Sequence, residues 1–441
     1  MRNIIGIVLL VIFVSAVQAQ KKSILLDSLF HSLQKEKMFN GNMLVMDKGK
    51  VYLEESYGLK DYSKEISLDS NSVFHLADAS SMFTAVAIMQ LKEKGLLNYS
   101  DPINQYLKEI PFQGIKIKHL LTHTSGLPKL ESLFREYKLP EELSNDDVRK
   151  AVILYPYDLE YKPGENYREN LVDYVLLALI IEKASGITCN EYLQTRIFDL
   201  AQMKHTHFYN SKAAKKNQNI ARSYVYYPPV ARYEERSSIP EFSYLDSMDK
   251  LFGCCNIYST VQDLFLFYRS LVAGRLVSPA ILEDALIPVE LNDATQTNQA
   301  YGFEIIASNS GFAVYSEGDI PGNSTAILWK PKRNELIILC SNDNYPGLNY
   351  NNEIIKSVAT ILADGKLNIP RKSVCFEIMK NILVWSDKEL ENNFNSMVSN
   401  TKRYYLDKQE LRNIGEKLKD KGEKDKADFL MNVAKKYSDQ K

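Results

Sequence analysis

The stretch Phe74–Ala85 has the sequence FHLADASSMFTA and continues directly into the helical pattern Val86–Leu91. Asp78 and Ser81 lie three residues apart in this stretch, so a helix that begins here presents both side chains on one face. Further along the chain, His119–Pro128 has the sequence HLLTHTSGLP, and its Gly and Pro are typical of a helix end. The stretch therefore predicts a helix with two polar side chains at its N-terminal end.

These segments together resemble the serine β-lactamase-related family, which includes class C β-lactamases, penicillin-binding DD-peptidases and esterases. Members of the family carry F-x-I-x-S-x-S-K-x-F-T-A at the first segment, with the Ser as nucleophile and the Lys as its activating base. Aligned on Phe74 and Phe83-Thr84-Ala85 without a gap, the nucleophile position falls on Asp78 and the lysine position on Ser81. The resemblance implies an α/β (α+β) fold, with an antiparallel sheet flanked by helices, an all-α subdomain, and the pocket between sheet and subdomain.

Neither substituted residue can perform the chemistry of the residue that it replaces. An ionised carboxylate at Asp78 is a poor acyl acceptor in water, and the hydroxyl of Ser81 is not a base. An Asp near a helix N-terminus commonly accepts hydrogen bonds from free backbone amides. We therefore expect Asp78 to cap the helix rather than to act in catalysis.

Two further family motifs are altered in the same way. The Y-x-N motif that follows Pro163-Gly164 falls on Glu169 and Leu171, and the strand-borne K-T-G or H-x-G motif begins at Ser316. Gly318 fits the family's glycine, at a place where two backbones approach closely. Because all three motifs lose their acid–base members, we predict a catalytically inactive binding protein. The alternative is an active serine hydrolase, such as an esterase, DD-peptidase or β-lactamase-like enzyme, with relocated catalytic residues.

The altered positions predict an acidic cavity. Asp78 and Glu169 would both face it, with Glu317 nearby, and Ser81 completes the set of ligand-binding candidates. Neighbouring carboxylates raise one another's pKa or attract a cation. This pattern suggests a site for a cationic ligand or a divalent metal, and the favoured alternative is that the carboxylates are simply solvated in a disused cleft. The expected partner is a small molecule, a peptide or a peptidoglycan fragment; no cofactor and no metal-ligand motif is indicated.

Composition, net charge and the spacing of histidines and cysteines argue against several other classes of function. The 441 residues are enough for two or three domains, and a net charge of −1 does not recommend a nucleic acid as partner. No spacing supplies a triad partner for any histidine, so each is expected to be structural. The same holds for the cysteines, whose odd number cannot pair completely and whose spacing suggests no zinc site. The histidines concerned are His75, His119, His123, His205 and His207, and the cysteines are Cys189, Cys254, Cys255, Cys340 and Cys375.

The N-terminus predicts export. Arg2 precedes an apolar run from Ile4 to Val17, and Val17-Gln18-Ala19 offers small residues at the positions that a signal peptidase recognises. We therefore predict a signal peptide over residues 1–19, with an uncleaved anchor as the alternative. The mature protein is expected to be periplasmic or secreted.

The remaining patterns divide the chain into a main domain, residues 20–368, and a helical extension, residues 369–441. A β-hairpin is predicted over Phe39–Leu59, and helices dominate from Met82 to Met203. Strands are expected again at 302–306, 326–329 and 335–340, after a helix at Val261–Leu271. The C-terminal extension carries two apolar stripes that resemble a tetratricopeptide-type hairpin, which would pack on the main domain or on a protein partner. The stripes are Leu411, Ile414 and Leu418, then Ala427, Leu430, Ala434 and Tyr437.

Overall fold

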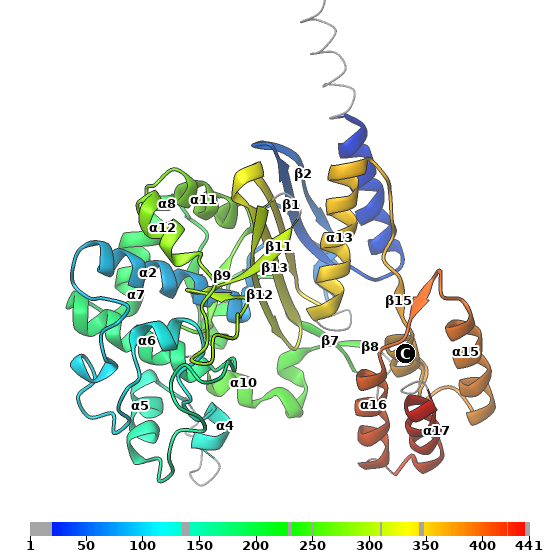
Figure 1. Cartoon of the computed structure of the whole chain (residues 1–441). Helices are drawn as coiled ribbons and strands as arrows, with labels where there is room; N and C mark the ends of the chain where they lie inside the picture. Colours follow the sequence, from blue (N-terminus) through cyan, green and yellow to red (C-terminus); the bar gives the residue numbers. More distant parts are fainter. Residues whose placement is uncertain are drawn as a thin grey trace, which may run out of the picture. The chain divides into compact units, whose positions relative to one another are not determined.

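The computed structural model describes residues 20–134, 142–227, 232–248, 250–308, 311–343, 348–420 and 422–436 (Figure 1). The chain divides into two compact units. The sheet unit comprises Gly41–Ser223 and Ile239–Asn342, and the terminal unit comprises the chain up to Asn40, Tyr224–Ser238 and Asp343–Lys441. The predicted signal peptide, residues 1–19, lies outside the described residues.

A seven-stranded antiparallel sheet forms the centre of the sheet unit. Its strand order is β10-β11-β12-β13-β14-β1-β2, so the N-terminal hairpin pairs with the last strand of the chain's main sheet. Lys48 and Gly49 connect β1 to β2 with φ angles of 53° and 76°, the left-handed pair that a tight hairpin turn requires. The predicted hairpin, the returning strands and the single antiparallel sheet are confirmed. The strands are β1 (Gly41–Asp47), β2 (Lys50–Tyr57), β10 (Gln299–Ala300), β11 (Phe303–Ser308), β12 (Gly311–Ile320), β13 (Asn323–Lys330) and β14 (Glu335–Ser341).

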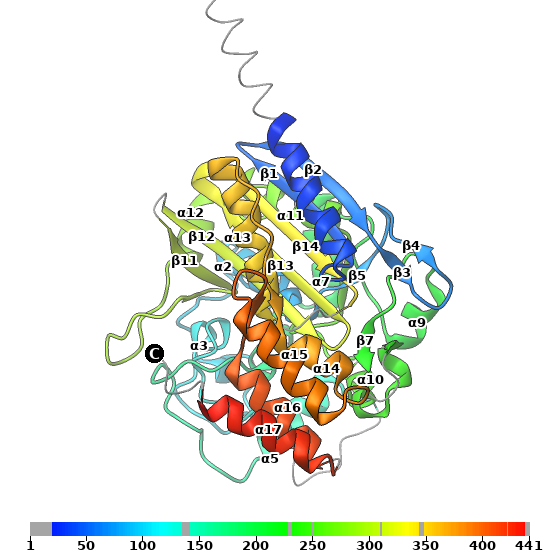
Figure 2. The same cartoon turned by 90° about the vertical axis from the view of Figure 1, so that its right-hand side faces the viewer.

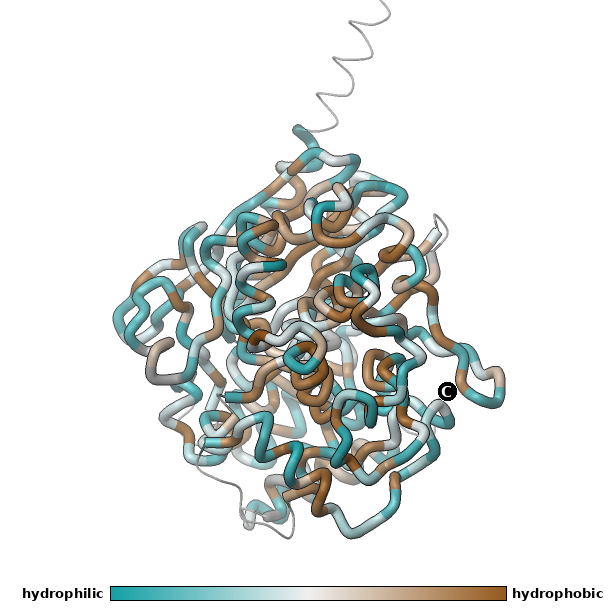
Figure 3. The backbone as a smooth tube through the Cα atoms, turned by 90° about the vertical axis from the view of Figure 1, so that its left-hand side faces the viewer, coloured by the Kyte–Doolittle hydropathy of each residue, from teal (hydrophilic) through white to brown (hydrophobic). Residues whose placement is uncertain are grey.

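Helices α2 (Ser81–Glu93) and α6 (Leu171–Ser185) form the core of the helical part of this unit. Helix α2 is buried from Met82 to Leu91, where it contacts α6. In Figure 3 hydrophobic, brown stretches alternate with hydrophilic, teal ones along the chain, as expected of helices with one buried face. The predicted helical subdomain is thus confirmed. Its other helices are α3 (Ile117–Leu121), α4 (Leu130–Leu133), α5 (Asn145–Leu154), α7 (Cys189–Leu193), a π-helical turn (Gln194–Phe198), α8 (Asp199–Ala201), α11 (Val261–Val272) and α12 (Pro279–Ala285).

Short elements connect the sheet to the helices. The three-stranded sheet β5-β9-β6 is the most important of them, because β5 leads directly into the Asp78 segment. The short strands are β3 (Leu59–Asp61), β4 (Ile66–Ser67), β5 (Phe74–His75), β6 (His207–Phe208) and β9 (Ile257–Ser259). The remaining short helices are η1 (Ala77–Ser80), η2 (Ile103–Gln105), α9 (Ser211–Lys216), η6 (Pro240–Phe242), α10 (Tyr244–Ser247) and η7 (Pro331–Arg333).

The terminal unit contains a helix over residues 20–35, α13 (Leu348–Asp364) and the C-terminal helices (Figure 2). The predicted apolar stripes of α16 and α17 pack into one hydrophobic cluster with α14 and α15, except that Tyr437 lies outside the described residues. The tetratricopeptide likeness and the boundary at residue 369 remain predictions. The other elements are β7 (Tyr224–Tyr227), β8 (Arg232–Glu235), η5 (Arg236–Ser238), β15 (Lys372–Ser373), α14 (Val374–Asn381), α15 (Asp387–Ser399), β16 (Tyr404–Tyr405), α16 (Lys408–Asp420) and α17 (Lys424–Lys436).

Among the helices of the described ranges, none combines the length and the apolar character that crossing a bilayer demands.

Candidate functional site

A strained turn places Asp78 and Ser81. Strand β5 pairs with β9, with His75 opposite Tyr258, and the next turn contains Ala77 at a positive φ of 50°. His75 fixes this turn, because its Nδ1 accepts a hydrogen bond of 2.9 Å from the Ala77 amide. The imidazole ring also packs edge-on against Tyr258 at 4.6 Å. The expected structural role of His75 is confirmed.

The expected capping role of Asp78 is wrong. A 3-10 helix, η1, precedes α2 and has Leu76 at its N-cap position, which places Asp78 inside its first turn. Helix α2 then begins at Ser81 with Ser80 at its N-cap position, and neither helix has a side-chain capping hydrogen bond. The carboxyl group of Asp78 instead lines a cavity.

The backbone of strand β12 is in direct contact with the backbone of this turn. A Cβ atom added to Gly318 would lie 2.2 Å from the Leu76 carbonyl oxygen and 2.8 Å from the Asp78 amide nitrogen. Only glycine permits such an approach, so the predicted close backbone contact at Gly318 is confirmed. The contact carries the neighbouring residues of β12, Ser316 and Glu317, to the wall of the same cavity.

The cavity has a volume of about 100 Å³. Asp78, Ser81, Glu169, Ser316 and Glu317, which come from separate parts of the sequence, all line it, whereas Leu171 does not. Its remaining walls are Ala79, Leu121, His123, Tyr167, Tyr174, Gln299, Gly302, Phe303, Glu304 and Tyr315. Among these lining residues, all from the described ranges, there is neither a lysine nor an arginine.

Sequence reasoning missed part of the acidic wall. Glu304 of β11 lies directly opposite Tyr315 of β12 in the sheet register, and the Tyr315 hydroxyl donates a 2.7 Å hydrogen bond to Glu317. The register therefore brings both carboxyl groups to one tyrosine. Tyr167 also lines the cavity and is 37% exposed. Only the strand alternation around Phe303–Ile306 could have drawn attention to Glu304.

Burial and neighbouring negative charges raise the pKa of three acids in the cavity. Burial raises the pKa of Asp78 to about 7, and the charges of Glu169 and Asp319 add to this effect while His123 opposes it. Burial also raises the pKa of Glu304, with the charge of Glu169 contributing. Burial likewise raises the pKa of Glu317, although its hydrogen bond from Tyr315 acts in the opposite direction. At neutral pH the carboxyl group of Asp78 is thus partly protonated.

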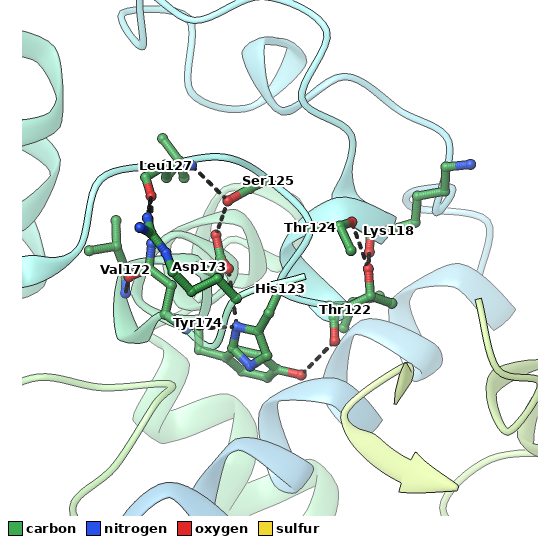
Figure 4. Close-up of polar contacts among 12 residues, drawn as sticks. Lys118, Thr122, His123, Thr124, Ser125, Leu127, Val172, Asp173 and Tyr174 are labelled. Carbon is green, nitrogen blue, oxygen red and sulfur yellow. Dashed lines mark hydrogen bonds and ion pairs between the residues drawn. The ribbon is translucent and has the colours of Figure 1, made fainter. Parts of the chain in front are cut away.

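His123 contacts an acidic side chain that the spacing of residues in the sequence did not reveal. Its Nδ1 lies 3.1 Å from Oδ2 of the fully buried Asp173, whose other oxygen accepts a 2.5 Å hydrogen bond from Ser125 (Figure 4). The Asn170 amide also points at the same Nδ1, at 3.2 Å. The carboxylate, not the imidazole, is the central member, so this is not the order in which a histidine activates a serine. The group joins the start of α6 to the segment after α3, as expected of a structural histidine.

The other histidines also have structural partners. His119 accepts a 3.1 Å hydrogen bond from the Lys116 amide through Nδ1, and burial lowers its pKa to about 4. The His205 amide donates to Asp263 at 2.7 Å, and a His207 ring nitrogen lies 3.1 Å from the Lys204 carbonyl oxygen. The predicted structural role of His119 is therefore confirmed, whereas the roles of the His205 and His207 side chains stay predictions.

The five cysteines lie in the described ranges as buried thiols rather than disulfides, as expected of small apolar residues. Across the described ranges, no group of three or more His, Cys, Asp or Glu side chains is arranged to hold a metal ion. The metal form of the acidic-cavity hypothesis gains no support from this arrangement.

Comparison with known proteins agrees with this geometry. The family model described as Beta-lactamase matches residues 26–360. The chain belongs to the beta-lactamase family. A penicillin-binding protein of Bacillus subtilis (strain 168) is 32% identical over 358 residues, which cover 80% of this chain and 79% of the relative. A teichoic acid D-alanine hydrolase of Staphylococcus aureus is 28% identical over 250 residues, 56% of this chain and 58% of that protein.

Solved structures show the fold of this family member. A penicillin-binding protein from Bacillus halodurans superposes with a TM-score of 0.65 at 22% identity, covering 75% of this chain and 98% of the other. A class C beta-lactamase superposes with a TM-score of 0.64 at 16% identity, covering 79% and 97%. The β-lactamase/transpeptidase-like fold, with mixed helices and an antiparallel sheet, is thereby confirmed.

Proposed function

We propose that this beta-lactamase family member is a non-catalytic binding protein, whose cavity takes a positively charged group of a small molecule, a peptide or a peptidoglycan fragment. One observation carries the proposal. The cavity wall has four carboxyl side chains, from Asp78, Glu169, Glu304 and Glu317, and no lysine or arginine among its described residues. An active member of the family would present a lysine here, according to the resemblance.

The side chains in the cavity support binding rather than acyl transfer. Ser81 lines the cavity from α2. It occupies the position of the family's lysine, which would activate a hydroxyl group three residues earlier in the sequence. Nδ1 of His123 donates to Asp173 in one tautomer and accepts from the Asn170 amide in the other. Ser125 is only 1% exposed and donates to Asp173, so it does not face a substrate.

The charge pattern favours an ammonium group as the bound element. Closely spaced carboxyl groups repel one another when ionised, and a cation among them relieves that repulsion. The relative named as a teichoic acid D-alanine hydrolase makes D-alanyl esters suitable first ligands. Such esters carry a free ammonium group at neutral pH.

D-Alanine methyl ester and its N-acetyl derivative provide a matched test, because they differ in the ammonium charge and its acetyl cap. Isothermal titration should show binding of the free amine and a large loss of affinity for the acetylated ester. Glu169→Gln should weaken binding of the amine, whereas Glu109→Gln, at an exposed position away from the cavity, should not. Equal binding of the two esters would contradict the charge argument.

A covalent probe tests inactivity separately. A labelled fluorophosphonate or penicillin should leave the protein unmodified over hours, with an active penicillin-binding protein as positive control. Labelling of any serine would overturn the non-catalytic proposal in favour of an active serine hydrolase with relocated residues.

The N-terminal sequence supports placing this function in the periplasm or outside the cell, and cell fractionation tests this location. The C-terminal helices are proposed as a surface for a protein partner, and a truncation at residue 369 tests this role.

A further inference from the structure

A second cavity, of about 390 Å³, lies within the terminal unit and has the opposite charge. Three segments far apart in the sequence form it: the end of the helix of residues 20–35, the segment before α14, and the turn before β16. The parallel pairing of β15 with β16 and a 2.8 Å hydrogen bond from the Lys372 amide to the Arg403 carbonyl hold the last two together. The lining residues are Ser32, Lys35, Glu36, Met38, Ile369, Pro370, Lys372, Lys402 and Arg403.

The cavity contains four cationic side chains and one carboxylate. Glu36 forms ion pairs with Lys372 and, at 3.4 Å, with Arg403. The hydrogen bond from Lys372, with the charges of both cations, holds the pKa of Glu36 below its ordinary value, so this carboxylate remains ionised. One internal negative charge thus fixes two cations in place and leaves an excess of positive charge.

Lys35 and Lys402 supply that excess. Both are exposed, and within the parts of the chain that the structure describes neither has an ion pair or side-chain hydrogen bond. Their ammonium groups are therefore available to a ligand at the mouth of the cavity. Like charges brought together by folding repel one another, and a bound anion would offset this cost.

Apart from Ser32, the rest of the wall is apolar. Met38 and Pro370 are buried at the cavity, and Ile369 is 44% exposed beside Leu367, which is 41% exposed. A ligand that suits this arrangement carries a compact anionic group next to a hydrocarbon part. Phosphate suits the polar side better than a carboxylate does, because it presents more acceptor oxygens and more charge to an arginine and several lysines.

We propose that this cavity binds a phosphate group attached to an apolar moiety, either as the head group of an anionic lipid or as a soluble phosphate ester. The proposal is independent of the acidic cavity, because no residue is shared between the two. It assigns the terminal unit a role in binding that is separate from the proposed function of the sheet unit.

Two arms of one experiment separate the sources of the phosphate. In the first, the full chain is titrated with n-butyl phosphate and with inorganic phosphate. In the second, it is sedimented with phosphatidylcholine vesicles that do or do not contain phosphatidylglycerol, and the difference between the two is the readout. Binding in the vesicle arm alone identifies a lipid head group, and binding in the titration arm identifies a soluble ester; both support the proposal.

The variant Lys35→Gln/Lys402→Gln should lower the affinity about tenfold in whichever arm is positive, since each lysine contributes to attraction of an anionic surface. Lys35→Arg/Lys402→Arg keeps the charge and should retain binding. Lys108→Gln/Lys183→Gln removes the same charge from exposed positions of the sheet unit and should have no effect. The absence of binding in both arms would overturn the proposal, as would an equal loss in the two glutamine variants or tighter binding of a polyglutamate peptide than of either phosphate probe.

Discussion

Gly318→Ala should detach the strand that carries Ser316 and Glu317 from the turn that carries Asp78. The added methyl group would lie 2.2 Å from the Leu76 carbonyl oxygen, 2.7 Å from the Ala79 amide nitrogen and 2.8 Å from the Asp78 amide nitrogen. All three are backbone atoms, so no flexible side chain can move away to make room. Overpacking of a well-packed site costs about 1–3 kcal/mol, and a triple backbone collision belongs at the upper end, about 3 kcal/mol.

Gly95→Ala is the matched control in the same unit. Gly95 has a positive φ of 70° and nothing within 4 Å of the added Cβ, so it isolates the backbone cost without a collision. That cost is about 1 kcal/mol. Gly318 lies in a strand and has no left-handed φ, so its cost comes from the collision alone.

Thermal unfolding of the two variants provides the assay. Domains of 150–250 residues lose roughly 2–4 °C per kcal/mol, so Gly318→Ala should lower Tm by about 6 °C or more and Gly95→Ala by about 2–4 °C. Gly318→Ala should also abolish binding of D-alanine methyl ester, because relief of the collision must displace either β12 or η1. A Tm at or above that of Gly95→Ala, with ligand binding intact, would refute the close approach of β12 to the Asp78 turn.

Three further predictions concern the residues of the site. Because the pKa of Asp78 is raised to about 7 in the folded protein, the folded state retains a proton that the unfolded chain releases near pH 4, so the free energy of unfolding should fall as pH rises between about 4 and 7. Asp78→Asn should therefore stabilise the protein by up to about 4 kcal/mol at pH 8 and not at pH 3, as measured by denaturant unfolding at both pH values; an equal effect at both would contradict the raised pKa. Ser125→Ala removes a 2.5 Å hydrogen bond to the buried Asp173 and should cost about 2–3 kcal/mol, measured in the same way, with a loss below 0.5 kcal/mol showing that the bond is not needed. The triple variant Asp78→Ser/Ser81→Lys/Glu169→Tyr should gain covalent labelling by fluorophosphonate at position 78, and a folded but unlabelled triple variant would show that the scaffold has lost more than these three groups.

The sequence predicted those parts of the fold that local patterns determine. Alternating apolar residues and the Lys48-Gly49 turn predicted the first hairpin, and apolar stripes predicted the packing of α16 and α17. The positions of Asp78, Ser81, Glu169 and Glu317 came from motif spacing, and the fold brings all four to one cavity. That they bind a ligand remains a prediction.

Other features depended on contacts between distant segments. Asp173 lies 50 residues from His123 and reaches it only because the start of α6 packs against the segment after α3. Glu304 joins the acidic wall through its register with Tyr315, which no pattern within β11 specifies. The predicted capping role of Asp78 was wrong because a 3-10 helix begins at Ala77, which has a positive φ, before the start of α2. Asp78 therefore lies inside the first turn of a helix and not at its N-cap position.

The loss of a catalytic lysine does not by itself account for the four carboxyl groups in the cavity. Removal of the lysine alone would leave a nearly neutral cavity, yet η1, the segment before α6, β11 and β12 each contribute a carboxyl group. The raised pKa values of Asp78, Glu304 and Glu317 show that burial and mutual repulsion oppose full ionisation. A bound ammonium group would favour the ionised forms and release protons, so its affinity should rise with pH up to about 7 and the heat of binding should depend on the ionisation enthalpy of the buffer. Binding that is independent of pH between 5 and 7 would show that these carboxyl groups do not contact the ligand.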